Sequence, residues 1–420
     1  MKKLSIVLSL IFLFFVNQVK ALHILIGMSE GQKDHLKAYG IAYWVLGKEK
    51  EVSWLLNYDG GSFMFAYDVA FENECKIRGV SYEVITDGKS NSIIAEISNP
   101  EVNMEVVVLL KIPKIAVYSP KNKQPWDDAV TMVLEYAEIP YDKVFDDEVL
   151  DDKLIQYDWL HLHHEDFTGQ YGKFWSHYRN TPWYIEDVKT NEECATMHGY
   201  TKVSQMKLAV GKKIRDFCIG GGFLFAMCSA TDTYDIALAA DGVDICESMF
   251  DGDGADPEAQ KNLNFENCYA FKDFQLERSP YEYEHASIDN TIFRGLNESE
   301  DYFTLFDYSA KWDIVPTMLC QNHTQTIKGF MGQTTSFRKQ FIKSEVLVMG
   351  ETKAADEARY IHGTMGKGTW TFYSGHDPED YQHMVGEPPT NLALFPNSPG
   401  YRLILNNILF PSAKKKKLKT

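Results

Sequence analysis

After its first 21 residues the chain lacks an apolar run of the roughly 20 residues that a bilayer span requires. It also lacks internal repeats and low-complexity linkers. Basic side chains are in the minority, since 42 Lys and Arg stand against 59 Asp and Glu and leave a formal net charge of −17. This excess of negative charge argues against nucleic acid or anionic lipid as the main partner. We therefore expect no membrane span and no nucleic-acid partner.

The first 21 residues have the features of a cleavable secretory signal. Two lysines precede an apolar run over residues 4–16, and Val19 and Ala21 lie three and one positions before a cleavage point. A membrane anchor is the alternative interpretation, but the run is too short for one. We expect cleavage near Ala21 and a mature protein in the periplasm or outside the cell.

Cysteine is present in an odd number. Seven cysteines follow the signal, so at least one stays unpaired in an oxidising compartment. The count leaves room for one free, functional cysteine.

The pattern along the mature chain divides it into two α/β parts and a tail. Residues 22–112 combine a helix with strands, and Asp59-Gly60 predicts a hairpin turn between two of these strands. Further strands are predicted for VSYEVIT, SIIAEI and MEVVVLL. Over residues 113–411 strands and helices alternate, which predicts an α/β fold with a parallel sheet covered on both faces. Residues 412–420 are predicted to be a solvated, lysine-rich tail.

The stretch GGGFLFAMCSA, residues 220–230, predicts a nucleophile elbow. Five apolar residues lead into Cys228, and a helical pattern starts directly after it. Such a turn places a thiol at the carboxyl edge of the sheet, where a helix N-terminus lowers its pKa. The N–H of Ser229, with one from Gly221 or Gly222, would bind an oxyanion. A buried structural cysteine is the alternative.

The stretch GKGTWTFYSGHDPEDY, residues 366–381, predicts a strand followed by a histidine. His376 would act as a general base beside Cys228 if the two strands are neighbours. Glu379 or Asp377 would orient its imidazole. An exposed histidine in a turn is the alternative.

A third cluster, HLHHED at residues 161–166, follows another predicted strand. His163 and His164 with Asp166, joined by His376, would form a divalent metal site, although the spacing is not that of a standard zinc motif. In a milder interpretation His164 and Glu165 border the cleft and bind a polar substrate. The third interpretation is a strand end stabilised by hydrogen bonds.

Together GGGFLFAMCSA, GKGTWTFYSGHDPED and PGYRLILNNILF resemble the trehalose-utilisation (ThuA-like) proteins of the class I glutamine amidotransferase-like superfamily, over roughly residues 113–411. The resemblance implies a flavodoxin-like, three-layer parallel sheet and a hydrolytic pair at Cys228 and His376. Two departures stand out. Met227 and Ser229 replace the glycines near the cysteine, and Glu379 comes three rather than two residues after the histidine.

The whole chain, with LLNYDGGSF, also resembles exported Bacteroidota proteins called asparagine synthetase B. That enzyme needs a cysteine at the mature N-terminus and an SGGxDS-like phosphate loop. The expected mature start here is Leu22, and the loop is missing.

From Cys228 and His376 we expect a cysteine-dependent hydrolase without a required cofactor, acting on an amide, peptide or sugar-derived substrate. The alternative is a non-catalytic or metal-assisted protein that handles a small molecule or carbohydrate.

Overall fold

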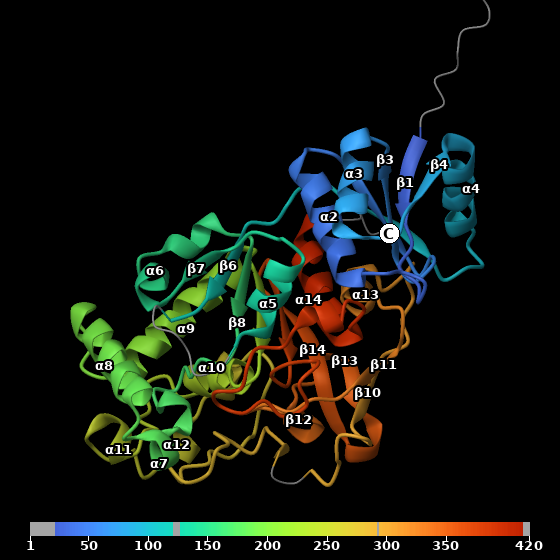
Figure 1. Ribbon diagram of the computed structural model, residues 1–420. Helices are drawn as coiled ribbons and strands as arrows, with labels where there is room; N and C mark the ends of the chain where they lie inside the picture. The colour runs from blue at the N-terminus through green and yellow to red at the C-terminus, as the bar shows by residue number, and fades with distance from the viewer. Residues whose placement is uncertain (1–21, 121–126, 292–293, 415–420) are drawn as a thin grey trace, which may run out of the picture.

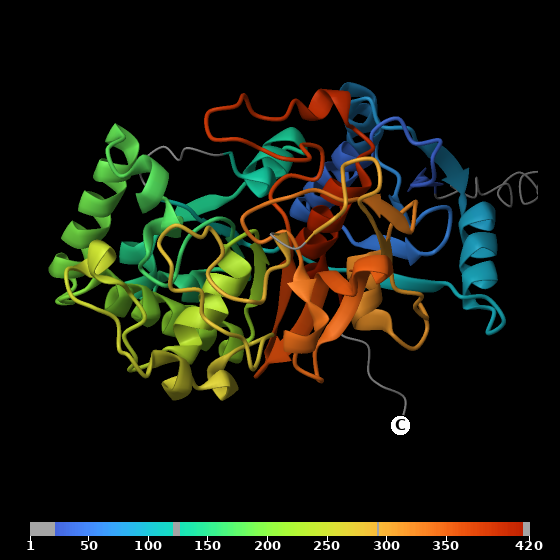
Figure 2. The same cartoon turned by 90° about the horizontal axis from the view of Figure 1, so that it is seen from below.

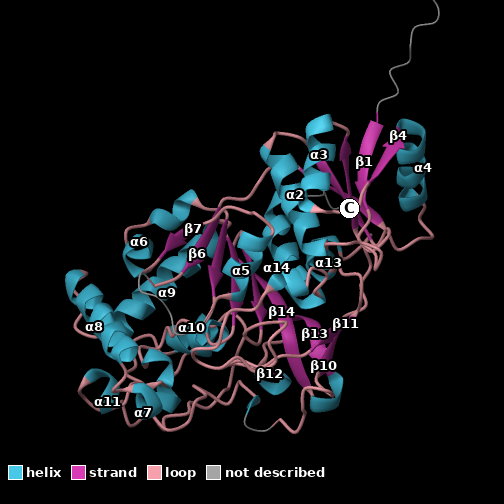
Figure 3. Cartoon of the chain, in the orientation of Figure 1, coloured by secondary structure: helices cyan, strands magenta, loops and turns pink. Residues whose placement is uncertain are grey.

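In the computed structural model, which describes residues 22–120, 127–291 and 294–414, helices surround two β-sheets (Figures 1 and 3). The predicted secretory signal and the last six residues of the predicted tail lie outside the described residues. Within them the fold is mixed α/β, with one sheet of five strands and one of ten. None of the described helices is long and apolar enough to cross a membrane.

The first sheet belongs to the N-terminal region and is antiparallel throughout. In spatial order its strands are β4 (Glu83–Thr86), β1 (Leu22–Ile26), β3 (Ser62–Ala66), β2 (Val52–Leu56) and β5 (Glu105–Leu109). Helices α2 (His35–Gly47) and α3 (Val69–Arg78) pack on one face, and α4 (Asp87–Ser98) packs on the other. The predicted hairpin is confirmed, because Leu55 pairs with Ser62 across the turn.

The predicted strand SIIAEI is wrong, since these residues lie inside α4. The Thr86 hydroxyl caps this helix by accepting from the N–H of Lys89. Ser90, Ile93 and Ile97 are its buried residues, spaced three and four apart. That spacing gives one helical stripe, which a short apolar run cannot distinguish from a strand without its neighbours.

Gly60 is required by the hairpin turn. Its φ is +75°, and a Cβ there would lie 2.2 Å from the carbonyl oxygen of Met28. We expect Gly60→Ala to lower the free energy of unfolding by about 3 kcal/mol, from left-handed strain plus a clash with backbone. Gly79→Ala is the matched control, because Gly79 has the same φ with open space around it, and it should cost about 1 kcal/mol. Equal losses for the two variants in urea unfolding would contradict this account.

The second sheet has a parallel part and an antiparallel extension. The parallel strands, in spatial order, are β7 (Asp142–Val144), β6 (Ile115–Tyr118), β8 (Trp159–Leu162), β9 (Phe223–Met227) and β15 (Gly368–Tyr373). Beyond β15 the sheet continues with antiparallel strands β14 (Glu357–Met365), β13 (Leu347–Thr352), β10 (Tyr302–Leu305) and β11 (Thr326–Lys328), while β12 (Phe337–Arg338) pairs with β14. The predicted parallel sheet is thus present as five strands, and antiparallel strands extend it.

Helices cover both faces of the parallel strands, as the alternation along β9 shows. Leu224 and Ala226 pack into a core with α9 (Val203–Gly220) and α10 (Ala230–Ala239). Phe225 and Met227 pack on the other face, into the core that contains α5 (Ala129–Tyr136) and α14 (Pro399–Leu409). A strand buried on both faces requires the continuous apolar run seen in its sequence.

The helix α14 joins the two sheets. It lies between the N-terminal region and the second sheet in both views (Figures 1 and 2), and its apolar side chains share one core with α2. The predicted tail starts differently from expectation, because Ala413 bridges to Leu109 and the N–H of Lys414 donates to the carbonyl of Val108. The first residues after α14 therefore extend the edge of the N-terminal sheet at β5.

Candidate functional site

Three neighbouring parallel strands deliver the predicted site residues to one edge of the second sheet. In register, His161 of β8 lies beside Phe225 of β9, and Tyr373 of β15 lies beside Met227. The residues that directly follow these strands therefore meet at their carboxyl ends, where sites gather in open α/β sheets.

A cluster of three buried histidines forms there. Ligand-capable atoms of His163, His164 and His376 all lie within 4.8 Å of one another, and Nε2 of His163 is 3.0 Å from Nδ1 of His376. Two nitrogens on a tetrahedral zinc ion, each at about 2.0–2.1 Å, would be about 3.3 Å apart. The spacing is thus compatible with a shared proton or with a shared metal.

A carboxylate supports this cluster from behind. Asp128 caps the N-terminus of α5, accepting from the N–H groups of Val130 and Thr131. Its oxygens also lie 3.3 Å from Nε2 of His161 and 3.6 Å from Nδ1 of His163. Burial alone would raise the pKa of Asp128, but the two rings hold it well below its usual value. A carboxylate behind one ring nitrogen orients the other nitrogen, here Nε2 of His163, toward the site.

A fourth histidine flanks the cluster. The ring of His383 stacks on that of His376 with centroids 5.1 Å apart, and its Nδ1 is 2.7 Å from the carboxylate of Asp380. Its Nε2 is buried without a hydrogen-bond partner among the described residues. Neither His383 nor Asp128 was predicted from the sequence as a site residue. The available signals were a second histidine in the loop after β15 and an aspartate before the first helix of the parallel part.

Burial sets the charge state of these groups. It lowers the pKa of His164 to about 3, with a contribution from His163, and it lowers that of His376 well below the usual value, with contributions from His163 and His164. Burial also raises the pKa of Glu165 to about 8, aided by Asp128. At neutral pH the imidazoles of His164 and His376 are therefore neutral, and the carboxyl group of Glu165 is mostly protonated.

Cys228 lies at the predicted strand-to-helix turn. Its φ is +51°, in the left-handed region that non-glycine residues seldom adopt. Its Sγ accepts from the N–H of Gln333 at 3.3 Å, and the N–H groups of Thr334 and Ser229 also act on the thiol. The predicted drop in pKa is wrong, because the residue is 1% exposed and burial raises the pKa of its thiol to about 11 despite these N–H groups.

Three of the predicted partners have other roles. The carboxylate of Glu379 hydrogen-bonds to Ser398, while His376 turns its Nδ1 to His163. The carboxylate of Asp377, the other predicted orienter, accepts from Tyr401, Thr390 and the N–H of Glu379. None of these contacts is the predicted pair of a carboxylate with His376.

Gly221 and Gly222 lie at the amino end of β9, opposite Cys228, and their N–H groups close the end of α9. They are therefore not oxyanion donors. Asp166 accepts from four groups of its own loop and lies 3.5 Å from His285, so it shapes residues 166–172 instead of joining the histidines.

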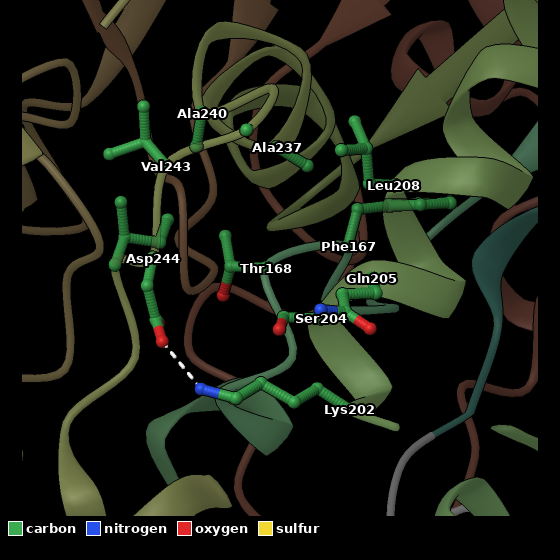
Figure 4. A pocket seen from close by; sticks show the side chains of 12 residues that line it. Phe167, Thr168, Lys202, Ser204, Gln205, Leu208, Ala237, Ala240, Val243 and Asp244 are labelled. Atoms are coloured by element: carbon green, nitrogen blue, oxygen red, sulfur yellow. Dashed lines mark hydrogen bonds and ion pairs between the residues drawn. The ribbon is translucent and has the colours of Figure 1, made fainter. Parts of the chain in front are cut away.

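A cavity of about 240 Å³ lies away from the histidines, between α9, α10 and the turn at residues 242–245 (Figure 4). Lys202 and Asp244 form an ion pair of 2.5 Å at its border. Its lining includes Phe167 and Thr168 but no residue of the histidine cluster.

Comparison with known proteins does not identify the chain. No protein-family model matches it, and no curated protein matches it. Among solved structures, the Salmonella typhimurium cytoplasmic proteins STM3548 and STM1381 align with TM-scores of 0.35 and 0.34 at 9% and 11% identity. Each alignment covers 72% of this chain and 100% of the other. Likeness at this level carries no argument about fold or function.

Proposed function

We propose that this protein is a metal-assisted hydrolase for a small-molecule or carbohydrate substrate, with His163, His164 and His376 as ligands of one divalent transition metal. The observation that carries the proposal is the convergence of three buried histidines within 4.8 Å. His163 and His164 follow β8 and His376 follows β15, so tertiary structure brings the third histidine to the first two. A bound divalent ion would polarise a carbonyl or activate a water molecule.

The residues around the histidines fit this role. The carboxylate of Asp128 lies 3.6 Å from Nδ1 of His163, whose Nε2 is directed at His376. His383 offers a further nitrogen beside His376. Glu165, whose carboxyl oxygen accepts from the N–H of His163 at 3.1 Å, would exchange protons with a substrate at the same edge. Imidazole ligands suit zinc and other late first-row metals.

The proposal includes a flavodoxin-like, three-layer scaffold of the amidotransferase-like type. The strand order β7-β6-β8-β9-β15 supports it, because in chain order this is the 2-1-3-4-5 order of flavodoxin-like sheets. Asp128 and His163 follow β6 and β8, the pair at the switch point where such sheets bind ligands. We further propose that the chain is exported, on the pattern of residues 1–21.

The test is metal analysis of the untagged protein. We expect one equivalent of a divalent transition metal that depends on the histidine cluster. Chelation should remove this metal without unfolding the protein. The metal should also be required for hydrolysis in a screen of chromogenic esters, amides and glycosides. The proposal is disproved if the purified protein contains no such metal and binds no zinc, nickel or cobalt at this site in calorimetry.

A cysteine-dependent hydrolase is the second candidate, favoured by the strained turn at Cys228. A non-glycine residue at φ +51° costs about 1–3 kcal/mol and persists most often where function requires it. The N–H groups of Gln333, Thr334 and Ser229 around the thiol would stabilise negative charge there.

Alkylation distinguishes the two candidates. Because burial raises the pKa of the Cys228 thiol to about 11, we expect iodoacetamide at pH 8 to modify it about 100-fold more slowly than in urea-unfolded protein. The rate should rise steadily as the pH approaches 11. Peptide mass spectrometry measures it separately from the other six cysteines. Fast modification with an apparent pKa below about 8.5, lost in His376→Ala, would favour the cysteine hydrolase.

A further inference from the structure

A second group of metal-ligating side chains lies at the outer edge of the molecule, where α6 (Asp146–Leu150) meets α8 (Pro182–Met197). Cys194 and His198 are four residues apart, so they project from the same side at the end of α8. Asp147 reaches them from the first turn of α6. The helix α8 lies at the left margin of the fold, whereas α5, which Asp128 caps, lies nearer its centre (Figure 1).

The three ligand atoms converge on one point. Oδ1 of Asp147 lies 3.0 Å from Nε2 of His198 and 3.2 Å from Sγ of Cys194, and all three atoms lie within 4.8 Å of one another. Tetrahedral zinc, with bonds of about 2.0–2.3 Å, separates its ligands by about 3.3–3.6 Å. The two distances from Asp147 therefore need to lengthen by only a few tenths of an ångström to admit the ion.

We propose that Cys194, His198 and Asp147 bind a zinc ion that links α8 to α6, with water as the fourth ligand. One thiolate and one carboxylate neutralise its two positive charges. The thiol of Cys194 donates to Asp147, so a bound zinc ion would replace the thiol proton, which is released to solvent. The side chains of Asp147 and His198 are 24% and 21% exposed, which leaves an entry path and room for the water.

The link has a structural consequence. Tyr184 of α8 packs against Tyr171, and Trp183 packs against Phe174. The loop between these two aromatics carries Gly172, whose carbonyl accepts from the side chain of Gln333, the residue beside Cys228. A zinc ion at α6–α8 thus fixes the helix that covers this loop. The site is independent of the proposed hydrolase function.

The test uses cobalt as a spectroscopic substitute for zinc in the full-length protein. We expect cobalt, added until the signal saturates, to produce a thiolate-to-metal charge-transfer band that corresponds to one equivalent bound at this site. Zinc should then displace the cobalt and remove the band. Cys194→Ser should remove the band, and His198→Ala and Asp147→Asn should weaken zinc binding by about 100-fold or more. Bound zinc should also protect Cys194 from alkylation.

Two controls separate this site from others. Cys246→Ser, in a different cluster with Asp244 and Asp251, should keep the band, as should His376→Ala. Circular dichroism confirms that each variant is folded. A band that persists in Cys194→Ser, or the absence of any band in the folded wild-type protein, would overturn the proposal.

Discussion

Replacing His376 with alanine is expected to abolish stoichiometric metal binding at the carboxyl edge of the second sheet. Nε2 of His163 lies 3.0 Å from Nδ1 of His376, and the loss of either residue leaves at most two of the three proposed histidine ligands. We expect the affinity for zinc, measured by calorimetry on the chelator-treated protein, to fall by at least about 100-fold in His163→Ala and in His376→Ala.

A graded series makes this prediction specific. Asp128→Asn keeps all three histidines but removes the charge behind His163, and it should weaken binding by about 10–100-fold. His362→Ala is the matched control, since His362 is also a buried histidine but hydrogen-bonds Thr371 in the sheet. If His362→Ala reduced metal binding as much as His376→Ala, the losses would reflect unfolding and the assignment would fail.

Replacing Arg402 with alanine is expected to cause the largest loss of stability among the variants considered. Arg402 is fully buried in α14. Its guanidinium donates to the carbonyls of Met28 and Gly60 and to the hydroxyl of Tyr39, all in the N-terminal region. Truncation removes one donor from each of these three acceptors and leaves a cavity in the shared core. We expect the free energy of unfolding to fall by about 3–4 kcal/mol, measured by urea denaturation.

Two variants separate hydrogen bonding from volume and charge. Arg402→Met restores most of the packing without the donors, so it should recover less than half of the loss. Arg179→Ala removes an exposed arginine that stacks on Trp175 and should cost less than about 1 kcal/mol. A full recovery in Arg402→Met would show that Arg402 contributes packing alone.

The regular elements were largely predictable from local pattern. The hairpin at Asp59-Gly60, the strand ending at Met227 and the helix after Cys228 all follow from turn chemistry and apolar runs, and all three are present. The segment SIIAEI was not predictable in the same way. Its apolar residues fit both periods, and the cap at Thr86 together with the packing on the sheet selects the helix.

The site was predictable only in part. Sequence position placed His163, Cys228 and His376 at strand ends, and the strand order brings those ends together. The sequence did not indicate which ring faces which partner. Glu379 turns to Ser398, because its side-chain direction depends on the packing of the loop after β15. Gly221 and Gly222 lie at the opposite end of β9 from Cys228, because the length of the strand separates them.

The sequence by itself determined the α/β character, the hairpin and the placement of reactive side chains after strands, because turn propensity and apolar periodicity are local properties of the chain. Only the tertiary structure decided that three histidines share one buried point, that Asp128 supports one of them, and that Cys228 is a buried thiol of raised pKa. These features join residues up to 213 positions apart, as in the pair of His163 and His376. Distance, burial and charge across such separations are set by how the strands pair and what covers their ends.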